Sequence, residues 1–437
     1  MKRLIEFQKW DTINHVKDVI VMLREYVKVG EVEKKKYGEV LTPLSLVKEM
    51  IQTIPNDFWK NPNSKILDSC NGVGPFLIMV IYRLMLGLKD WEPDEEKRYK
   101  HIVENMVYAG ELQPKNMFLW LCAIDPQDEY LCNIFTGSFL SKEFDEHMKN
   151  VWGVEKFDLI LGNPPYQDST KISRNSTLWT KFLLKSDRII KGFGYLLFIT
   201  PNSWMGPTEN QRENIKSVFN NNKFIYLNLT CGKYFGVGST FSFYLIQKSQ
   251  PECETIILNN DGKFSFYIND MKFLPNNINK TTLSIIKKFF YSENSKMGFT
   301  SNLRNDNFDD NGNYLVWYSN NFKKSKIIGK NSKVKKIIVN LPGYLNPRYD
   351  DGVYATSKNN LWVNSSLDES VSMIKYLNSK LIKFLVCKEC KYSGFNNIGI
   401  LKLIPNVNFK INWTDQQLYE YFNLSQEEID LIEKNIK

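Results

Sequence analysis

Residues 157–166 read FDLILGNPPY, an apolar stretch followed directly by Asn163-Pro164-Pro165-Tyr166. The apolar part is typical of a buried strand, so the four residues after it would lie at the carboxyl end of that strand. The prolines fix φ and remove backbone donors, which leaves the Asn163 side-chain oxygen and the Pro164 carbonyl as neighbouring acceptors. Two such acceptors suit a planar NH2 group, and the Tyr166 ring offers a face on which a planar substrate can stack.

Strand and helix patterns alternate on both sides of this stretch, which predicts a parallel sheet with crossover helices. Two further strands without a helix between them, at 224–230 and 240–248, predict an antiparallel hairpin at one edge. The fold expected is therefore α/β, a Rossmann-like and mostly parallel sheet. We expect the other strands at 65–68, 107–111, 130–135, 157–163 and 194–200, and helices from 43, from 75 and at 114–124, 177–190 and 209–219. Thr42 is expected as the N-cap of the first of these helices, with Pro43 at its first position.

A chain of 437 residues is too long for one typical core, so we expect two domains. The first would span 1–250, with a helical segment at 1–35, and carry the catalytic site. Beyond it the composition shifts to Asn, Lys, Tyr and Phe with short strand-like pieces, which predicts a smaller mixed α+β domain over 251–437. Thr414 with Gln417 and Ser425 with Glu428 each match a capping box ahead of a helix near the end of the chain.

Composition bounds the class of protein. Hydrophobic residues make up 43% and aromatic residues 14%, which is typical of a globular protein, and no apolar run is long enough for a membrane span. Seven scattered cysteines and no signal-peptide pattern predict a cytoplasmic location, in a bacterial or virus-infected host cell. A structural zinc site needs four ligands, so the single pair Cys387 and Cys390 predicts no metal. The net charge of +9 suggests a polyanionic partner.

The loop Asp68-Ser-Cys70-Asn-Gly72-Val-Gly74 has two glycines where a strand gives way to a helix, so backbone amides can approach a ligand closely. A third glycine is missing, since Leu77 stands there, which disfavours a pyrophosphate ligand. Glu111 ends the next strand, where a carboxylate can accept both ribose hydroxyls of a nucleoside; a solvated strand-end acid is the alternative. The crowded acidic stretch at 93–97 does not fit a nuclease metal site and is expected to be an exposed segment.

These motifs, in this order, resemble the gamma class of S-adenosylmethionine-dependent adenine-N6 DNA methyltransferases of restriction-modification systems, over roughly residues 36–250. The resemblance implies S-adenosylmethionine as cofactor and Asn163-Pro164-Pro165-Tyr166 as the catalytic motif. It also implies that Asn163 contacts the cofactor and that Glu111 binds the ribose of the cofactor. The cofactor-binding residues implied are Tyr37, Thr42, Pro43, Asp68, Cys70, Gly72, Gly74, Glu111, Ser138, Phe139 and Asn163.

Two details of the resemblance concern aromatic and acidic positions. The family has an aromatic residue that stacks on the second face of a flipped adenine, and Phe235 is our first choice for it, with Phe241 second. Together with Tyr166 it would hold the extruded base. Where the family usually has an acidic residue for the cofactor adenine, this chain has Ser138, so stacking on Phe139 is expected to contribute more to that contact.

The C-terminal half decides between substrates. Residues 323–336, KKSKIIGKNSKVKK, contain seven lysines and no acid, which favours contacts with phosphates over a merely solvated surface. The resemblance implies a target-recognition domain for double-stranded DNA, and leaves a cognate restriction endonuclease open as a further partner. The alternatives are methyl transfer to an amide or adenine of protein or RNA, and a non-catalytic DNA specificity subunit. Expected DNA contacts are Lys323, Lys324, Lys326, Lys333, Lys335, Lys336, Arg348 and Lys391.

Overall fold

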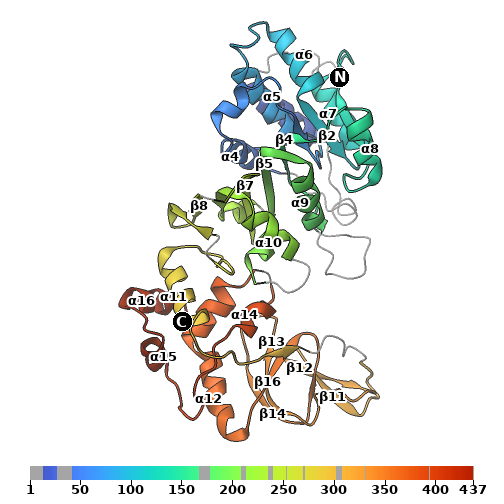
Figure 1. Ribbon diagram of the computed structural model, residues 1–437. Coiled ribbons are helices and arrows are strands. Elements are labelled where there is room, and N and C mark those ends of the chain that lie inside the picture. Colours follow the sequence, from blue (N-terminus) through green and yellow to red (C-terminus); the bar gives the residue numbers. More distant parts are fainter. Residues whose placement is uncertain are drawn as a thin grey trace.

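The computed structural model describes residues 13–26, 42–166, 178–207, 213–234, 240–251, 253–268, 271–301, 308–329, 331–392 and 394–436. Figure 1 shows an elongated molecule with a large sheet and its helices at one end and smaller sheets at the other. The C-terminal helices lie beside the junction between these two parts.

The large sheet has nine strands in the order β3-β2-β1-β4-β5-β7-β6-β8-β9. Strands β3, β2, β1, β4 and β5 pair in parallel, and β7 is antiparallel to both β5 and β6. The expected α/β sheet with an antiparallel hairpin is therefore confirmed. The strands are β1 Ile66–Asp68, β2 Val107–Glu111, β3 Asn133–Thr136, β4 Phe157–Gly162, β5 Ile190–Pro201, β6 Lys223–Asn228, β7 Phe241–Gln247, β8 Thr255–Asn259 and β9 Gly262–Phe266.

The sheet continues past residue 250, where we expected the first domain to end. Strand β8 pairs in parallel with β6, and β9 closes the edge as an antiparallel partner of β8. The expected boundary therefore falls between two strands of one sheet. The edge hairpin is β8–β9, because these strands lie outside the predicted pair β6–β7.

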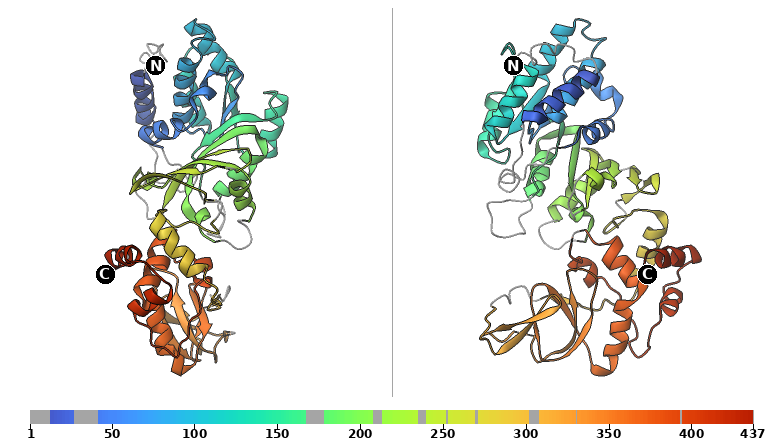
Figure 2. Two further views of the ribbon diagram at one scale, coloured as in Figure 1. Left: turned by 60° about the vertical axis from the view of Figure 1, so that its left-hand side comes forward. Right: turned by 180° about the vertical axis from the view of Figure 1, so that it is seen from behind.

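Helices cover both faces of the large sheet (Figure 2). One face packs against a core shared by α2 Ile13–Tyr26, α4 Leu44–Ile51, α5 Pro75–Gly87, α6 Glu95–Asn105 and α7 Pro114–Ile124. The other packs against α8 Lys142–Asn150, α9 Leu178–Ile189 and α10 Glu213–Asn220. The short helices of this part are η1 Asn56–Lys60, η2 Asn202–Met205 and η3 Cys231–Tyr234.

The acidic stretch at 93–97 is exposed, as expected, and it leads into helix α6. The Asp94 side chain caps the helix by accepting from the Lys97 amide at 2.9 Å. Tyr99, Ile102 and Val103 of α6 are buried together with Arg98, whereas residues 95–97 are exposed.

The C-terminal half is mixed α+β, as expected. Its four-stranded sheet has the order β10-β16-β13-β14 and its three-stranded sheet the order β12-β11-β15. The strands are β10 Thr300–Ser301, β11 Tyr314–Tyr318, β12 Asn321–Ser325, β13 Lys335–Asn340, β14 Arg348–Asp351, β15 Ala355–Thr356 and β16 Asn360–Asn364. The helices are α11 Lys280–Phe290, α12 Leu367–Asn378, α13 Lys380–Ile382, η5 Lys383–Glu389, α14 Ile398–Lys402, α15 Asp415–Tyr421 and α16 Gln426–Asn435.

Both predicted capping boxes are present. The side chains of Thr414 and Ser425 accept from the amides of Gln417 and Glu428, and those two side chains accept from the cap amides in return. The core of the C-terminal half is continuous with the core on the α8–α10 face of the large sheet. The two halves are therefore packed together as well as linked by the chain.

Candidate active site

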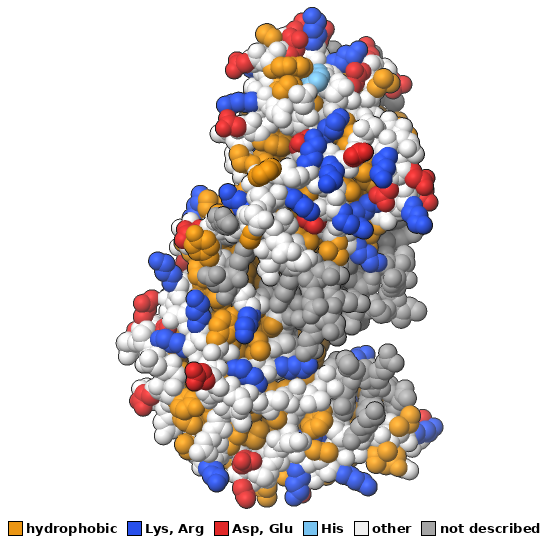
Figure 3. Space-filling model, in the orientation of Figure 1, with side chains coloured by type: hydrophobic (Ala, Val, Ile, Leu, Met, Phe, Trp, Pro, Cys, Tyr) orange, Lys and Arg blue, Asp and Glu red, His pale blue; other side chains and the backbone are white. Residues whose placement is uncertain are grey.

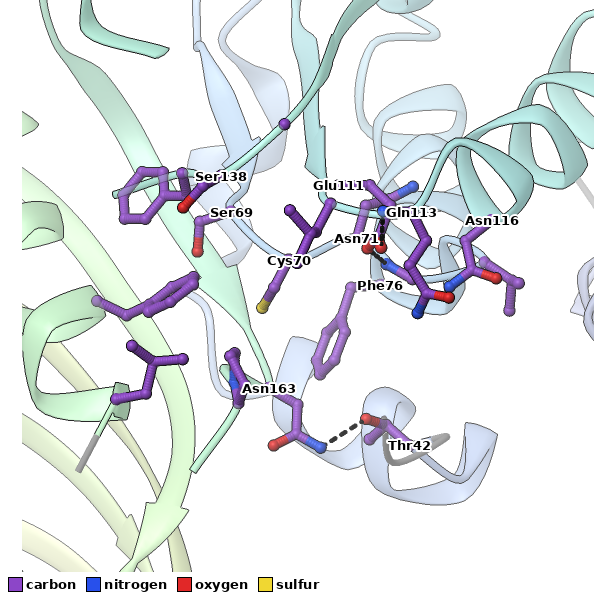
Figure 4. Close-up of a pocket in the computed structure, with 18 of the residues that line it drawn as sticks. Thr42, Ser69, Cys70, Asn71, Phe76, Glu111, Gln113, Asn116, Ser138 and Asn163 are labelled. Atoms are coloured by element: carbon purple, nitrogen blue, oxygen red, sulfur yellow. Dashed lines mark hydrogen bonds between the residues drawn. The ribbon is translucent and has the colours of Figure 1, made fainter. Parts of the chain in front are cut away.

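A pocket opens at the carboxyl ends of β1, β2, β3 and β4, where the strand order of the sheet reverses. This is the position at which open α/β sheets bind their ligands. Figure 4 shows Glu111, Asn71 and Gln113 together at one side, Ser138 and Ser69 at another, and the Asn163 amide directed toward Thr42. The loop after β1, the end of β2, the loop after β3 and the end of β4 each contribute residues to the lining.

The Glu111 carboxylate is held by two backbone amides. The Gly72 amide donates to Oε2 at 2.8 Å, and the Gln113 amide donates to Oε1 at 2.8 Å. Glu111 is 8% exposed and lines the pocket, which excludes the alternative of a fully solvated strand-end acid. A carboxylate oxygen can accept more than one hydrogen bond, so Glu111 is a suitable acceptor for ligand hydroxyls.

Gly74 brings the start of α5 close to α7. Its φ is +79°, and a Cβ atom there would lie 1.8 Å from Cδ1 of Trp120. Only glycine fits this position, because both the backbone conformation and the contact exclude a side chain. Pro75 then begins α5, as the sequence predicts.

Asp68 lies at the floor of the loop and is fully buried. Its Oδ1 accepts from the Cys70 amide at 3.0 Å, and among the described residues its buried Oδ2 has no hydrogen-bond partner. Burial, together with the negative charge of Glu111, raises the pKa of Asp68 to about 8. A cationic ligand group in the pocket would offset the free-energy cost of ionising this buried carboxyl.

Asn71 is a pocket residue that the sequence analysis did not select. Both polar atoms of its side chain are buried, and within the described part of the chain neither has a hydrogen-bond partner. Buried polar groups are rarely left unpaired, so these atoms indicate a polar ligand. The asparagine directly precedes the first of the two glycines, but the motif drew attention to the glycines alone. The pocket also includes Phe76, Gln113 and Asn116, which the sequence analysis passed over.

The Asn163 side chain is fixed at both ends by hydroxyl groups. Its Nδ2 donates to the Thr42 Oγ1 at 3.1 Å, and its Oδ1 accepts from the Tyr166 hydroxyl at 2.6 Å. Thr42 was expected to cap the following helix, but Pro43 is the N-cap of α4 and no side-chain bond caps it. The Thr42 hydroxyl instead contacts the catalytic candidate across the pocket (Figure 4).

The remaining motif residues differ in their exposure to the pocket. Pro165 lines it, whereas Pro164 is buried and is not part of the lining. The Tyr166 ring lies 5.1 Å from the Phe241 ring at an interplanar angle of 36°. Burial raises the pKa of Tyr166 well above its usual value, so the hydroxyl stays a neutral donor. Tyr37 and Phe235, the other aromatic residues expected here, lie outside the described residues.

Ser138 and Phe139 both line the pocket after β3. The Ser138 hydroxyl accepts from the Leu140 amide at 3.3 Å, which holds it in the loop. The Phe139 ring is 2% exposed and lies 5.2 Å from the Phe182 ring, with the Lys185 Nζ 5.1 Å from its centroid. Contacts of either residue with a cofactor stay a prediction.

The expected DNA contacts are not equivalent in the structure. Six of them are exposed: Lys323, Lys324, Lys326, Lys333, Lys335 and Arg348. Two of these lysines form ion pairs, Lys326 with Asp309 at 2.6 Å and Lys335 with Asp351 at 3.1 Å. Lys391 is half-buried and donates to the Gly343 carbonyl at 2.9 Å.

The prediction that Lys336 contacts DNA is wrong, because its side chain is fully buried in an ion pair with Asp350. It also donates to the carbonyls of Asn331 and Val334 at 2.9 Å each. Its ammonium group cannot reach a phosphate. The strand alternation of β13 turns this lysine inward, which the run of basic letters conceals.

Among the described residues, no group of three or more His, Cys, Asp or Glu side chains is arranged to hold a metal ion, and Cys387 and Cys390 are free buried thiols. None of the helices in this part of the chain is both long and apolar enough to cross a bilayer.

Comparison with known proteins finds a family that part of this chain resembles. Residues 81–233, which include Glu111 and the motif at 163–166, match the family model described as the Eco57I restriction-modification methylase. Over these residues the chain is similar to the restriction-modification methylases. The resemblance found from the sequence is therefore confirmed.

A curated relative is similar to this chain in sequence, and two solved structures are similar to it in fold. An uncharacterized adenine-specific methylase from Mycoplasma pneumoniae is 25% identical over 256 residues, 43% of this chain and 60% of the relative, so less than two thirds of the relative's length is covered. The Type IIL restriction-modification enzyme MmeI, solved in complex with DNA, is 10% identical with a TM-score of 0.50 over 82% of this chain and 66% of that one.

The second structure is a nuclease-deletion mutant of the Type ISP restriction-modification enzyme LlaGI, solved in complex with a DNA substrate mimic. It is 11% identical with a TM-score of 0.51, over 88% of this chain and 54% of that one. At these identities the two likenesses show the fold, which extends through both halves of the molecule.

Proposed function

We propose that this protein transfers a methyl group from S-adenosylmethionine to N6 of a flipped adenine within a specific double-stranded DNA sequence. The observation that carries the proposal is the position of the Asn163 amide. It lies at the carboxyl end of β4, on the wall of a pocket whose opposite side presents a nucleoside-type carboxylate, Glu111.

The pocket residues fit the cofactor. In the proposed complex Glu111 accepts from the ribose hydroxyls, while Asn71 and Asp68 offer buried polar atoms that lack partners among the described residues. Phe139 and Ser138 would contact the adenine, and Cys70, Gly72 and Gly74 would let the backbone approach. When bound, S-adenosylmethionine supplies a sulfonium-activated methyl group beside Asn163.

Asn163 and the Pro164 carbonyl would act by accepting hydrogen bonds from the target NH2 group. Acceptors at this position favour a pyramidal nitrogen whose lone pair is free to react, so neither a cysteine nucleophile nor a histidine base is needed. The Tyr166 hydroxyl occupies the Asn163 Oδ1 at 2.6 Å, and it must turn away or share that oxygen when the base enters. The proton lost by the methylated nitrogen passes to solvent.

The proposed target is an adenine extruded from duplex DNA, because the amine of a paired adenine is hidden in the stack. Tyr166 would contact one face of the extruded ring. Phe235 is proposed for the other face, and Phe241 is held close to Tyr166 whichever residue fills that role. The relative's description as adenine-specific supports adenine as the target.

The C-terminal half is proposed as the target-recognition domain, with Lys323, Lys324, Lys326, Lys333, Lys335, Arg348 and Lys391 as DNA contacts. Such contacts act through counterion release and position the protein on the duplex. The two similar restriction-modification enzymes were solved with DNA or a DNA mimic, which supports DNA as the partner. We also propose a cytoplasmic location, and a cognate restriction endonuclease as a further partner.

One experiment distinguishes this proposal from two alternative functions. One is methyl transfer to an amide or adenine of protein or RNA, and the other is a non-catalytic DNA specificity subunit. Purified protein is incubated with tritiated S-adenosylmethionine and, separately, mixed-sequence duplex DNA, RNA or protein extract. Label in duplex DNA alone supports the proposal; label only in RNA or protein, or in none of the three, overturns it.

The Asn163→Ala variant supplies the mechanistic control. It removes the acceptor while leaving Glu111 and the glycine loop in place, so we expect loss of transfer with cofactor binding retained. Cofactor binding is measured by calorimetry with S-adenosylhomocysteine. Full transfer by the variant would refute the role of Asn163.

A further inference from the structure

We propose that Arg348 reads a guanine of the target sequence, and that an aromatic platform on the three-stranded sheet of the C-terminal half holds it ready for that contact. The inference rests on the proposed binding of double-stranded DNA. It adds a specificity-determining residue that the basic run of the sequence does not reveal.

Arg348 begins β14 and its side chain is exposed. Its guanidinium carbon lies 5.2 Å from the centroid of the Trp317 ring, a cation–π distance. A guanidinium that stacks by its face keeps its N–H groups free at the edge. Those edge donors match the O6 and N7 acceptors of guanine in the major groove.

The Trp317 ring has further aromatic neighbours. Tyr354 meets it edge-on with centroids 5.2 Å apart and planes at 80°, and Phe322 is its direct partner across the β11–β12 pair. The ring centroids of Phe322 and Tyr354 lie 6.0 Å apart, so Tyr354 is near both Trp317 and Phe322. Directly paired strand residues point to the same face, so Trp317 and Phe322 form one continuous surface.

A buried ion pair anchors the turn that carries Tyr354. Asp350 accepts from the amides of Val353 at 3.0 Å and Tyr354 at 3.2 Å, and it also pairs with the buried Lys336. Lys336 therefore has a structural role, because it holds the segment that follows Arg348. The platform is therefore tied to the core of the domain and is not a mobile loop.

The charges around the platform favour a polyanion. Lys324 is exposed and shares the Trp317 face, because it pairs directly with Leu315 two residues along β11. Asp351 and Asp309 are neutralised by Lys335 and Lys326, whereas Asp310 lies beside Lys323 and Lys324 and offsets part of their charge. Figure 1 places this small sheet at the outer end of the C-terminal half, and Figure 3 shows Lys and Arg side chains spread over the visible face of the molecule among acidic ones.

The geometry favours a base contact over a phosphate contact for Arg348. A phosphate can be met by any flexible cation and needs no aromatic support. Stacking restricts the guanidinium to a narrow set of directions, which lowers the entropy lost on forming a bidentate contact. A bidentate Arg–guanine pair discriminates between bases by about 1–3 kcal/mol.

The test is selection of bound duplexes from a randomised DNA pool, with the full chain and S-adenosylhomocysteine. We expect the wild-type protein to enrich a sequence containing a guanine, and Arg348→Gln to lose preference at that position by roughly tenfold or more. The matched control is Lys324→Gln, on the same face. It should weaken binding to all sequences and lower the salt dependence, with the enriched sequence unchanged.

Two substitutions of Trp317 test the platform. Trp317→Phe keeps a ring below Arg348 and should keep the guanine preference, whereas Trp317→Leu should reduce it with Arg348 still present. Thermal unfolding of each variant checks that the domain is folded. A full guanine preference in a folded Trp317→Leu protein would overturn the role of the platform.

The inference on Arg348 fails if Arg348→Gln enriches the same sequence as the wild type, even at lower affinity, or if the wild type enriches none. Because the assay measures binding, it separates this inference from the proposed activity. A protein that selects a sequence through Arg348 but leaves it unmethylated would contradict only the methyl transfer.

Discussion

The orientation of one amide decides whether the catalytic motif can work. Asn163 must present Oδ1 to an amine, and its Nδ2 bond to Thr42 fixes which end of the amide faces away. The sequence predicts the acceptor itself, because asparagine and prolines follow a buried strand. It cannot predict the Thr42 contact, since that threonine is 121 positions away in the chain and reads as a helix cap.

Replacing Thr42 by Val tests this positioning. Valine keeps the shape and removes the hydroxyl acceptor, so the amide loses its preference for the productive orientation. We expect kcat to fall about tenfold, equivalent to about 1.4 kcal/mol, with little change in the KM for DNA. Thr42→Ser, which keeps the hydroxyl, should retain most of the activity. A Thr42→Val enzyme with unchanged kcat and a raised KM for S-adenosylmethionine would show that Thr42 is a cofactor contact alone.

Asp68 should make the stability of the ligand-free protein depend on pH. Its pKa is about 8 when folded, against a reference of 3.8, so between these values the folded state holds a proton that the unfolded state lacks. The free energy of unfolding therefore falls as pH rises from about 4 to about 8, and this contribution is constant outside that range. Asp68→Asn carries no titratable proton and should flatten that part of the profile.

Urea unfolding of both proteins at several pH values measures the effect. The difference in stability between Asp68→Asn and the wild type should grow in favour of the variant as pH approaches 8. The variant should also bind S-adenosylhomocysteine more weakly at that pH, because the ionised carboxylate is lost. Parallel pH profiles would mean that Asp68 titrates normally.

At the scale of elements, the unit β1–loop–α5 shows why the site forms where it does. Its strand, glycine loop and proline-started helix follow from local sequence, as do the bounds of β2 and α7. Helices α6 and α8 were not predicted, because their charged outer faces mask a few apolar residues at helical spacing. Strands β8 and β9 were missed because their membership of the large sheet depends on pairing with β6, a long-range contact.

Gly74→Ala should destabilise the protein through this unit. The new Cβ would overlap the Trp120 ring, and φ of +79° adds backbone strain of about 1–3 kcal/mol. The comparison is Gly72→Ala, where φ is +56° but no atom lies within 4 Å of the new Cβ. Denaturant unfolding should therefore show a clearly larger loss for Gly74→Ala. Equal losses would indicate that backbone conformation alone decides.

At the scale of the molecule, the two halves share one hydrophobic core on the α8–α10 side of the large sheet. The sequence predicts two domains from length and composition, and it predicts a mixed C-terminal half, but it does not reveal this shared core. The strand order of the C-terminal sheets was equally out of reach, since short strands with weak alternation pair across long separations.

The shared core predicts cooperative unfolding. Calorimetry of the full chain should give one thermal transition, and S-adenosylhomocysteine should raise its Tm as a whole by binding the folded state alone. Two well-separated transitions, only one of which responds to the ligand, would show that the halves are energetically independent.

The identity of the methylated nucleoside tests methyl transfer most directly. Duplex DNA is incubated with the protein and S-adenosylmethionine, digested to nucleosides and analysed by mass spectrometry. We expect N6-methyldeoxyadenosine from the wild-type reaction and none from the Asn163→Ala reaction. A methyl group on cytosine, or equal N6-methyldeoxyadenosine from both proteins, would contradict the proposed pocket.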